Sequence, residues 1–173
     1  MVAVDVITEV WVPGEPKTKG SLTFRGNGYV EENVKGSARW RRLVASAVRA
    51  DLRRRHASLP SPAYMASAVP VGVRLQFWLP ASASMLADRA PVKPGSGDVD
   101  KLVRNVLDAL TDAHAYVDDV QVVRVIADKM VCTHETPGPQ NPGVLILAWA
   151  MTSEEVRLDA GHARLMWGRS NVG

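Results

Sequence analysis

The chain has little cysteine and histidine and no long apolar run, and each absence excludes a class of protein. Its single cysteine, Cys132, cannot form an intramolecular disulfide, and with only four scattered histidines it gives no zinc-binding spacing. No apolar run approaches the roughly twenty residues of a membrane-spanning helix. The segment 1–12 has no basic stretch ahead of an apolar core, which argues against a secretion signal. We therefore expect a protein of a reducing, cytoplasmic compartment with no membrane partner.

What the sequence does contain is the composition of one globular domain. Its 173 residues are 46% hydrophobic and 23% charged, which suits a folded domain with its own core. We predict an α/β fold, a single compact domain over residues 1–173 with a mixed β-sheet and a few packed helices. The residues from about 153 onward are expected to form a short helix and a mobile tail. Alternating or continuous apolar patterns predict strands at 4–12, 69–79, 120–132 and 144–149.

Two stretches have the apolar spacing of amphipathic helices. The first starts at Ser37, a plausible N-cap, and the second covers residues 101–112 with Asp100 as its N-cap. The buried stripe of the second helix should consist of Leu102, Val103, Val106, Leu107 and Leu110.

Positive charge is concentrated in two places. The net charge is only +3, but Arg42, Arg49 and Arg53 recur on the polar face of the first helix, and Lys17 and Lys19 lie on a loop rich in glycine and proline. Such residues can be an ordinary solvated surface or a surface that binds a polyanion such as nucleic acid.

Aspartates surround the second helix. Asp98 and Asp100 precede it with one residue between them, and Asp119 follows it. If the chain returns after the helix, all three carboxylates could meet at one point. Three oxygen ligands, with positions left for water and phosphate, suit Mg²⁺. A D-x-D pattern alone is equally typical of capping and loop aspartates.

Two cations lie among these aspartates. Arg104 is four residues after Asp100 and four before Asp108, a spacing that also gives simple ion pairs along one helix face. In a partly dehydrated site, Arg104 or Lys101 would instead stabilise the charge of a phosphoryl transition state.

The continuous pattern resembles a known family. Gly97-Asp98-Val99-Asp100, a helix ending in Leu107-Asp108-Ala109-Leu110, and then Asp118-Asp119-Val120-Gln121-Val122 are similar to the signature of RusA-like Holliday junction resolvases. The resemblance is strong from Gly97 to Lys129. It extends more loosely to residues 13–20, which look like the family's loop after its first strand.

This resemblance implies a RusA-like homodimer that depends on Mg²⁺, with Mn²⁺ able to substitute, and that cuts four-way DNA junctions by paired nicks. It makes Asp98, Asp100 and Asp119 the metal-binding, catalytic carboxylates. Arg104 stands where the family has a catalytic lysine, so it keeps the charge but cannot donate a proton, and Lys101 could share the role. The loop and helix cations would bind phosphates: Lys17, Lys19, Arg42, Arg49 and Arg53. The expected setting is DNA recombination and repair in the cytoplasm of a bacterium or a phage-infected cell.

Two other classes of protein share parts of this pattern. One is a branched-DNA-binding protein without catalysis, against which the retained carboxylates argue. A protein selective for a different branched substrate stays open as well. A D-x-D nucleotide-sugar transferase is disfavoured by the short chain and by the lack of a glycine-rich nucleotide-binding pattern.

Overall fold

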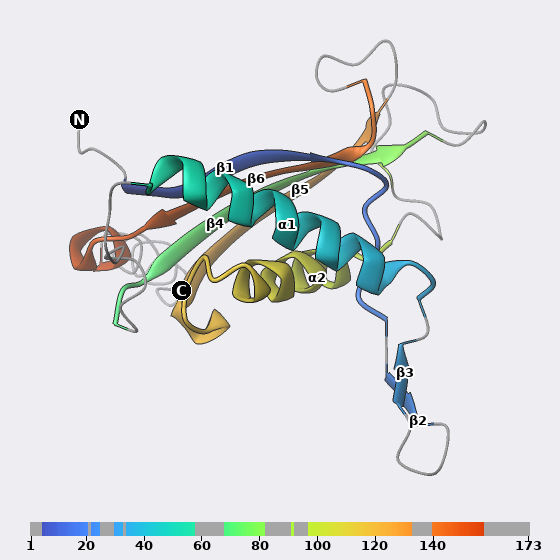
Figure 1. Cartoon of the computed structure of the whole chain (residues 1–173), viewed down its shortest axis with the longest axis horizontal. Helices are drawn as coiled ribbons and strands as arrows, with labels where there is room; N and C mark the ends of the chain where they lie inside the picture. Colours follow the sequence, from blue (N-terminus) through green and yellow to red (C-terminus); the bar gives the residue numbers. More distant parts are fainter. Residues whose placement is uncertain are drawn as a thin grey trace, which may run out of the picture.

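We analysed a computed structural model of the chain, which describes residues 5–20, 22–24, 30–32, 34–57, 68–81, 91, 97–132 and 140–157. Four strands form a mixed sheet, shown in Figure 1: β1 (Asp5–Pro13), β4 (Val71–Pro80), β5 (Val122–Cys132) and β6 (Gly143–Ala150). Their order is β1-β6-β4-β5, with β6 antiparallel to both neighbours and β4 parallel to β5. The predicted α/β class and the mixed sheet are confirmed, and β6 lies in the interior of the sheet.

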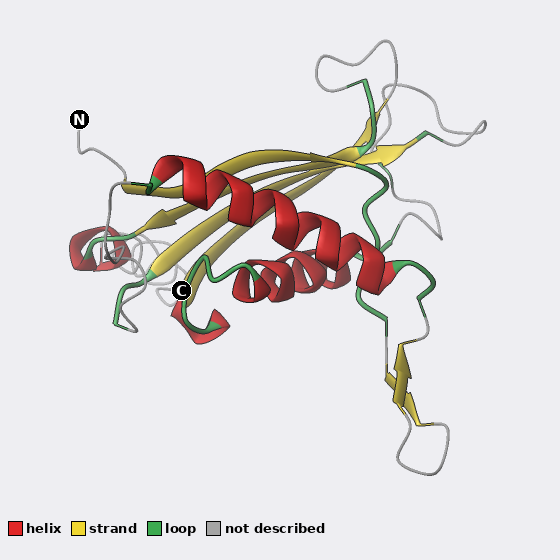
Figure 2. Ribbon diagram, viewed as in Figure 1, coloured by secondary structure: helices red, strands yellow, loops and turns green. Residues whose placement is uncertain are grey.

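Two helices, α1 (Ser37–Arg55) and α2 (Val99–Asp112), cover one face of this sheet (Figures 1 and 2). Because β4 alternates, it turns one set of side chains toward the helices, and Val71, Val73, Leu75 and Phe77 are fully buried there. From α2, the buried residues include Leu102, Val106 and Leu110, as the spacing predicted. Val103 and Leu107 of the predicted stripe are only partly buried.

Both predicted N-caps were wrong. α2 begins two residues earlier than expected, so Asp98 is its N-cap and Asp100 lies in its first turn. Gly97, at φ 80°, precedes the cap and supplies a left-handed turn that favours glycine. α1 is capped by Gly36, also left-handed, while Ser37 is the buried first helical residue and its Oγ accepts a hydrogen bond from Asn105.

The sequence patterns did not predict every element of secondary structure. The short strands β2 (Leu22–Phe24) and β3 (Val30–Glu32) pair as a hairpin that projects away from the sheet (Figure 1). A single 3₁₀ turn, η2 (Asp119–Gln121), comes before β5 where a strand was expected. Of the predicted C-terminal helix, residues 153–157 are helical and the rest lie outside the described residues. Across the described part of the chain, no helix is long and apolar enough to cross a membrane.

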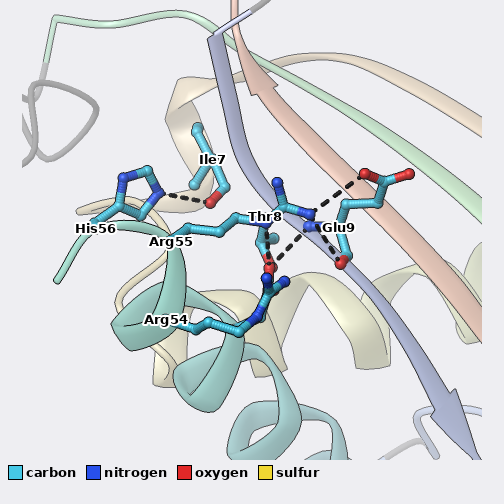
Figure 3. A network of polar contacts seen from close by, with 7 residues as sticks. Ile7, Thr8, Glu9, Arg54, Arg55 and His56 are labelled. Carbon is cyan, nitrogen blue, oxygen red and sulfur yellow. Dashed lines mark hydrogen bonds and ion pairs between the residues drawn. The ribbon is translucent and has the colours of Figure 1, made fainter.

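A polar network anchors the end of α1 to β1 (Figure 3). Its centre is Asp51, whose side chain is 5% exposed. The carboxylate accepts hydrogen bonds from the Thr8 hydroxyl at 2.8 Å and from the backbone N–H of Glu9 at 3.0 Å. Arg54 and Arg55 donate to it from the last turn of the helix at 2.5 and 2.9 Å. The helix end is therefore fixed to the sheet by a buried charge rather than by apolar contacts alone.

The turn that follows α2 contains a strained residue. His114 has φ 60°, and among the described residues it is the one non-glycine with a left-handed backbone. This conformation costs an L-residue about 1 kcal/mol, which glycine does not pay. We expect His114→Gly to stabilise the fold by up to about 1 kcal/mol, or about 2–4 °C in Tm for a chain of this size. Thermal unfolding followed by circular dichroism measures this, and His114→Ala, which retains the strain, is the matched control. An equal Tm for both variants would contradict the strain argument.

Candidate active site

A cavity of about 360 Å³ lies against α2. Three carboxylates line it, Asp100, Asp108 and Asp119, together with the guanidinium-bearing Arg104. The remaining lining is apolar: Val99, Val103, Leu107 and Ala127. Charged groups on an apolar floor interact more strongly than they would in water, because less solvent screens them.

The helix period explains why these residues share one face. Asp100, Arg104 and Asp108 are each four residues apart, so they lie one above another along α2. Val103 and Leu107 lie beside them and remain partly exposed because they form the wall of the cavity.

The turn η2 selects which of two adjacent aspartates reaches the cavity. Asp118 caps the turn, and its carboxylate accepts the backbone N–H of Val120 at 2.9 Å. The buried Gln121 accepts the backbone N–H of Val117 and of Asp118 and donates to the carbonyl of Val69. With Asp118 committed to the turn, Asp119 is the aspartate that lines the cavity.

Asp98 lies apart from the cavity lining. Its carboxylate is 66% exposed and pairs with Lys101 at 2.8 Å. The hydrogen bond from Lys101 lowers the pKa of Asp98, and the charge of Lys129 acts in the same direction. Lys101 is therefore engaged by Asp98 at the start of α2.

Asp119 lies in a field of negative charge. The neighbouring Asp118 carboxylate raises the pKa of Asp119, and partial desolvation and the charge of Asp108 add to the shift. The positive charge of Lys19 opposes it. A bound cation would relieve this repulsion.

The expected meeting of three carboxylates at one point is not seen within the chain. Asp119 has Asp118 and Asp108 as its charged carboxylate neighbours. Asp100 precedes Asp108 by eight residues, which is about 12 Å along a helix. In the part of the chain that the structure describes, no three Asp, Glu, His or Cys side chains are close enough to hold a metal ion together.

The donor set nevertheless fits a hard cation. Carboxylate oxygens are the ligands that Mg²⁺ takes, and it commonly uses only one or two of them, with water and substrate phosphate filling its other positions. The raised pKa of Asp119 marks the end of the cavity where negative charge is least balanced. The cavity therefore suits Mg²⁺ in chemistry and charge without containing a preformed cage.

The predicted DNA-binding residues fall into two groups. Arg42, Arg49 and Arg53 are exposed on α1, although Arg49 also donates to the backbone carbonyl of Asp112 at 2.7 Å. On the loop, Lys17 pairs with Glu15 at 2.7 Å, and Lys19 forms an ion pair with Asp108. The three arginines thus lie exposed along α1, whereas Lys19 pairs with a carboxylate that lines the cavity.

Sequence reasoning missed three residues around the cavity. Asp108 was interpreted only as a partner of Arg104, yet it lines the cavity. The buried Asn105 holds the loop by donating to the carbonyl of Lys17 at 2.8 Å. Lys129 donates to the carbonyl of Gly97 at 2.8 Å and so fixes the residue before the D-x-D pair. A polar Asn105 within an otherwise apolar helix stripe was the one available signal.

Comparison with known proteins agrees with the site. The family model described as "Endodeoxyribonuclease RusA" matches residues 13–138, which include the loop, both helices and all of β4 and β5. A search of curated protein sequences found no match to the chain. The family consists of endonucleases that resolve Holliday junctions, which are branched DNA. The chain belongs to the RusA endodeoxyribonuclease family.

Proposed function

We propose that this protein is a Mg²⁺-dependent endonuclease that resolves Holliday junctions by paired, symmetric nicks during DNA recombination and repair. The observation that carries the proposal is the cavity along α2, where Asp100, Asp119 and Arg104 of the family signature face a common space. The proposed setting is the cytoplasm of a bacterium or of a phage-infected cell.

The acidic residues are assigned to the metal. Asp98, Asp100 and Asp119 would hold Mg²⁺, with Mn²⁺ able to replace it. When bound, the ion makes water more acidic and offsets the negative charge of the phosphodiester. Asp98 would have to give up Lys101 for this role, which frees that amine to approach DNA.

Arg104 supplies fixed positive charge. It lies between Asp100 and Asp108 on the cavity face of α2, so a phosphate entering the cavity meets its guanidinium. Because arginine stays protonated, it acts by neutralising charge and not by transferring a proton.

DNA binding is assigned to the basic surface of α1 and to the loop. Arg42, Arg49 and Arg53 would contact phosphates, as would Lys17 and Lys19, which gives affinity that falls with salt. A four-way junction has approximate two-fold symmetry, and two equivalent nicks need two equivalent sites. A homodimer with two-fold symmetry supplies them.

The proposal is tested with a labelled synthetic four-way junction. We expect the wild-type protein to nick opposing strands in Mg²⁺ or Mn²⁺, to leave linear duplex of the same sequences uncut, and to stop when EDTA is added. Cleavage in EDTA, or equal cleavage of linear duplex, would contradict it. Ultracentrifugation of the free protein measures the dimer.

A second candidate is a branched-DNA-binding protein that is catalytically inactive or has a different selectivity. Two observations favour it: the described carboxylates form no group of three, and arginine replaces the catalytic lysine of the family at position 104. Tight junction binding without nicking in any divalent cation would support this candidate. Nicking of flaps or forks in preference to junctions would support the different selectivity.

We expect Arg104→Ala to lower the nicking rate of bound junction by about a hundredfold, as loss of one transition-state contact does. The dissociation constant should rise by less than about tenfold, since one phosphate contact is lost among many. Single-turnover rates and a filter-binding titration separate the two effects. Arg39→Ala, on an exposed part of α1, is the matched control. A larger loss in affinity than in rate would move Arg104 to DNA positioning.

A further inference from the structure

We propose that Lys19 is a catalytic residue, whose amine contacts the phosphate being cleaved, and that Asp108 is the positioning residue that holds this amine beside the cavity. The proposal rests on the proposed nuclease function and adds a group to its site.

The loop that carries Lys19 is held against α2 along its length. The backbone N–H of Lys19 donates to the carbonyl of Lys101 at 2.9 Å, and Asn105 donates to the carbonyl of Lys17 at 2.8 Å. Thr18 packs so closely on Gly97 that a Cβ at this glycine would lie 2.8 Å from the Thr18 Cγ2 atom. A lysine on a loop fixed at three consecutive residues has a defined place relative to α2.

Lys19 contacts α2 at two points, one through its backbone and one through its side chain. Its backbone lies beside Lys101, in the turn that carries Asp98 and Asp100, and its amine pairs with Asp108, in the half of the helix near Asp119. The charge of Lys19 also acts on Asp119. The amine therefore lies beside Asp108, a carboxylate that lines the cavity together with Asp119.

The Lys19 amine is neither buried nor fully solvated. Its side chain is 31% exposed, whereas that of Asp108 is 18% exposed. A partly exposed lysine of this kind can meet an incoming phosphate while a carboxylate aligns its amine.

Asp108 can release the amine without being left unpaired. A guanidinium nitrogen of Arg41 lies 3.6 Å from the same carboxylate oxygen. Arg41 is itself fixed by two hydrogen bonds to Asp112, at 2.5 and 2.6 Å. When Lys19 turns to a phosphate, Arg41 stays within ion-pair distance of Asp108, which reduces the cost of leaving that carboxylate without its lysine.

The charge balance of the cavity calls for this amine. Three carboxylates and one guanidinium line it, and DNA brings further negative charge. Lys101, the other nearby amine considered for this role, pairs with Asp98 outside the cavity lining, whereas Lys19 pairs with the cavity-lining Asp108. Lys19 supplies the compact ammonium charge that arginine at position 104 does not, and ammonium and guanidinium differ in how they contact phosphate.

The test uses full-length protein, excess enzyme and a labelled junction. We expect Lys19→Ala to lower the single-turnover nicking rate by about a hundredfold, with a dissociation constant raised by less than about tenfold. Lys19→Arg should recover part of the rate, because it keeps the charge but not the compact shape. Lys35→Ala removes an exposed lysine near the start of α1 and should nick at the wild-type rate. Melting temperatures of all variants identify any loss of folding.

The role of Asp108 is tested by a double-mutant cycle. Asp108→Asn should lower the rate by about tenfold in the wild type and change it little in Lys19→Ala, since the residue acts through the amine. Independent, multiplicative losses would overturn the positioning role. If the wild-type protein nicks the junction and Lys19→Ala nicks it as fast as Lys35→Ala, the catalytic role of Lys19 is overturned. A wild type that nicks no junction at all would instead contradict the proposed function.

Discussion

Asp119→Asn is expected to abolish junction nicking, by on the order of a thousandfold or more, while junction binding stays at the wild-type level. The substitution keeps the size of the side chain and removes a carboxylate from the part of the cavity where negative charges lie closest together. Loss of a charged group that acts on the reacting phosphate has effects of this order. Binding should not weaken, because removing a negative charge does not reduce the attraction for DNA.

Asp98→Asn and Asp100→Asn should have the same effect as Asp119→Asn if the three carboxylates share the metal. The measurement is nicking in Mg²⁺ beside binding in EDTA, so that affinity is scored without cleavage. Asp5→Asn, at the exposed start of β1, is the matched control. Wild-type nicking in all three variants would remove the metal assignment, whereas loss in only one or two would identify the real ligands.

Asp51→Ala is expected to produce the largest loss of stability, about 2–4 kcal/mol, because it leaves the buried Thr8 hydroxyl, the Glu9 N–H and the partly buried Arg55 without their shared acceptor. Thr8, the backbone of Glu9 and two arginines all lose the group they bind. For a chain of this size the Tm should fall by roughly 10 °C. Urea unfolding measures the difference, and Glu154→Ala, on an exposed carboxylate, should change it little.

The pH dependence of unfolding gives an independent signature of Asp51. Burial acts to raise the pKa of this carboxyl, but hydrogen bonds from Thr8, Glu9, Arg54 and Arg55 outweigh it and hold the pKa below its ordinary value of 3.8. The stabilisation is therefore present above about pH 3.8 and is lost as the pH falls through the lower folded pKa. The difference in unfolding free energy between wild type and Asp51→Ala should shrink in that acid range. A constant difference down to pH 2 would show that Asp51 contributes by packing alone.

How far the sequence predicted the fold depended on whether a pattern was periodic. The alternation in β4 and the spacing in α2 identified core residues such as Leu75 and Leu110, because a period reports which face is buried. The N-caps at Ser37 and Asp100 were wrong, since glycines at 36 and 97 set the helix starts through backbone conformation. The short hairpin β2–β3 has too few residues for a period.

In the candidate site, too, the sequence predicted some residues and could not predict others. Family spacing identified Asp98, Asp100 and Asp119, and these assignments stay predictions. Nothing local in the sequence links Lys19 to Asp108, which lie far apart in the chain and meet only when the loop folds onto α2. The spacing also suggested a common meeting point for the carboxylates, but it cannot report that Asp119 lies beside Asp108.

The parallel pairing of β4 with β5 bears on when the enzyme becomes active as it folds. Parallel neighbours need a crossover, and here α2 and η2 belong to the segment between Pro80 and Val122. β6 pairs with β4 and β1 across still longer segments of chain, so the whole sheet closes through long-range contacts, and such contacts form slowly. The turns of α1 and α2 form through local contacts, whereas Asp119 reaches the cavity only when the crossover has packed on the sheet. Recovery of nicking after dilution from urea should therefore lag behind the recovery of helical circular dichroism, which makes catalysis a late reporter of folding.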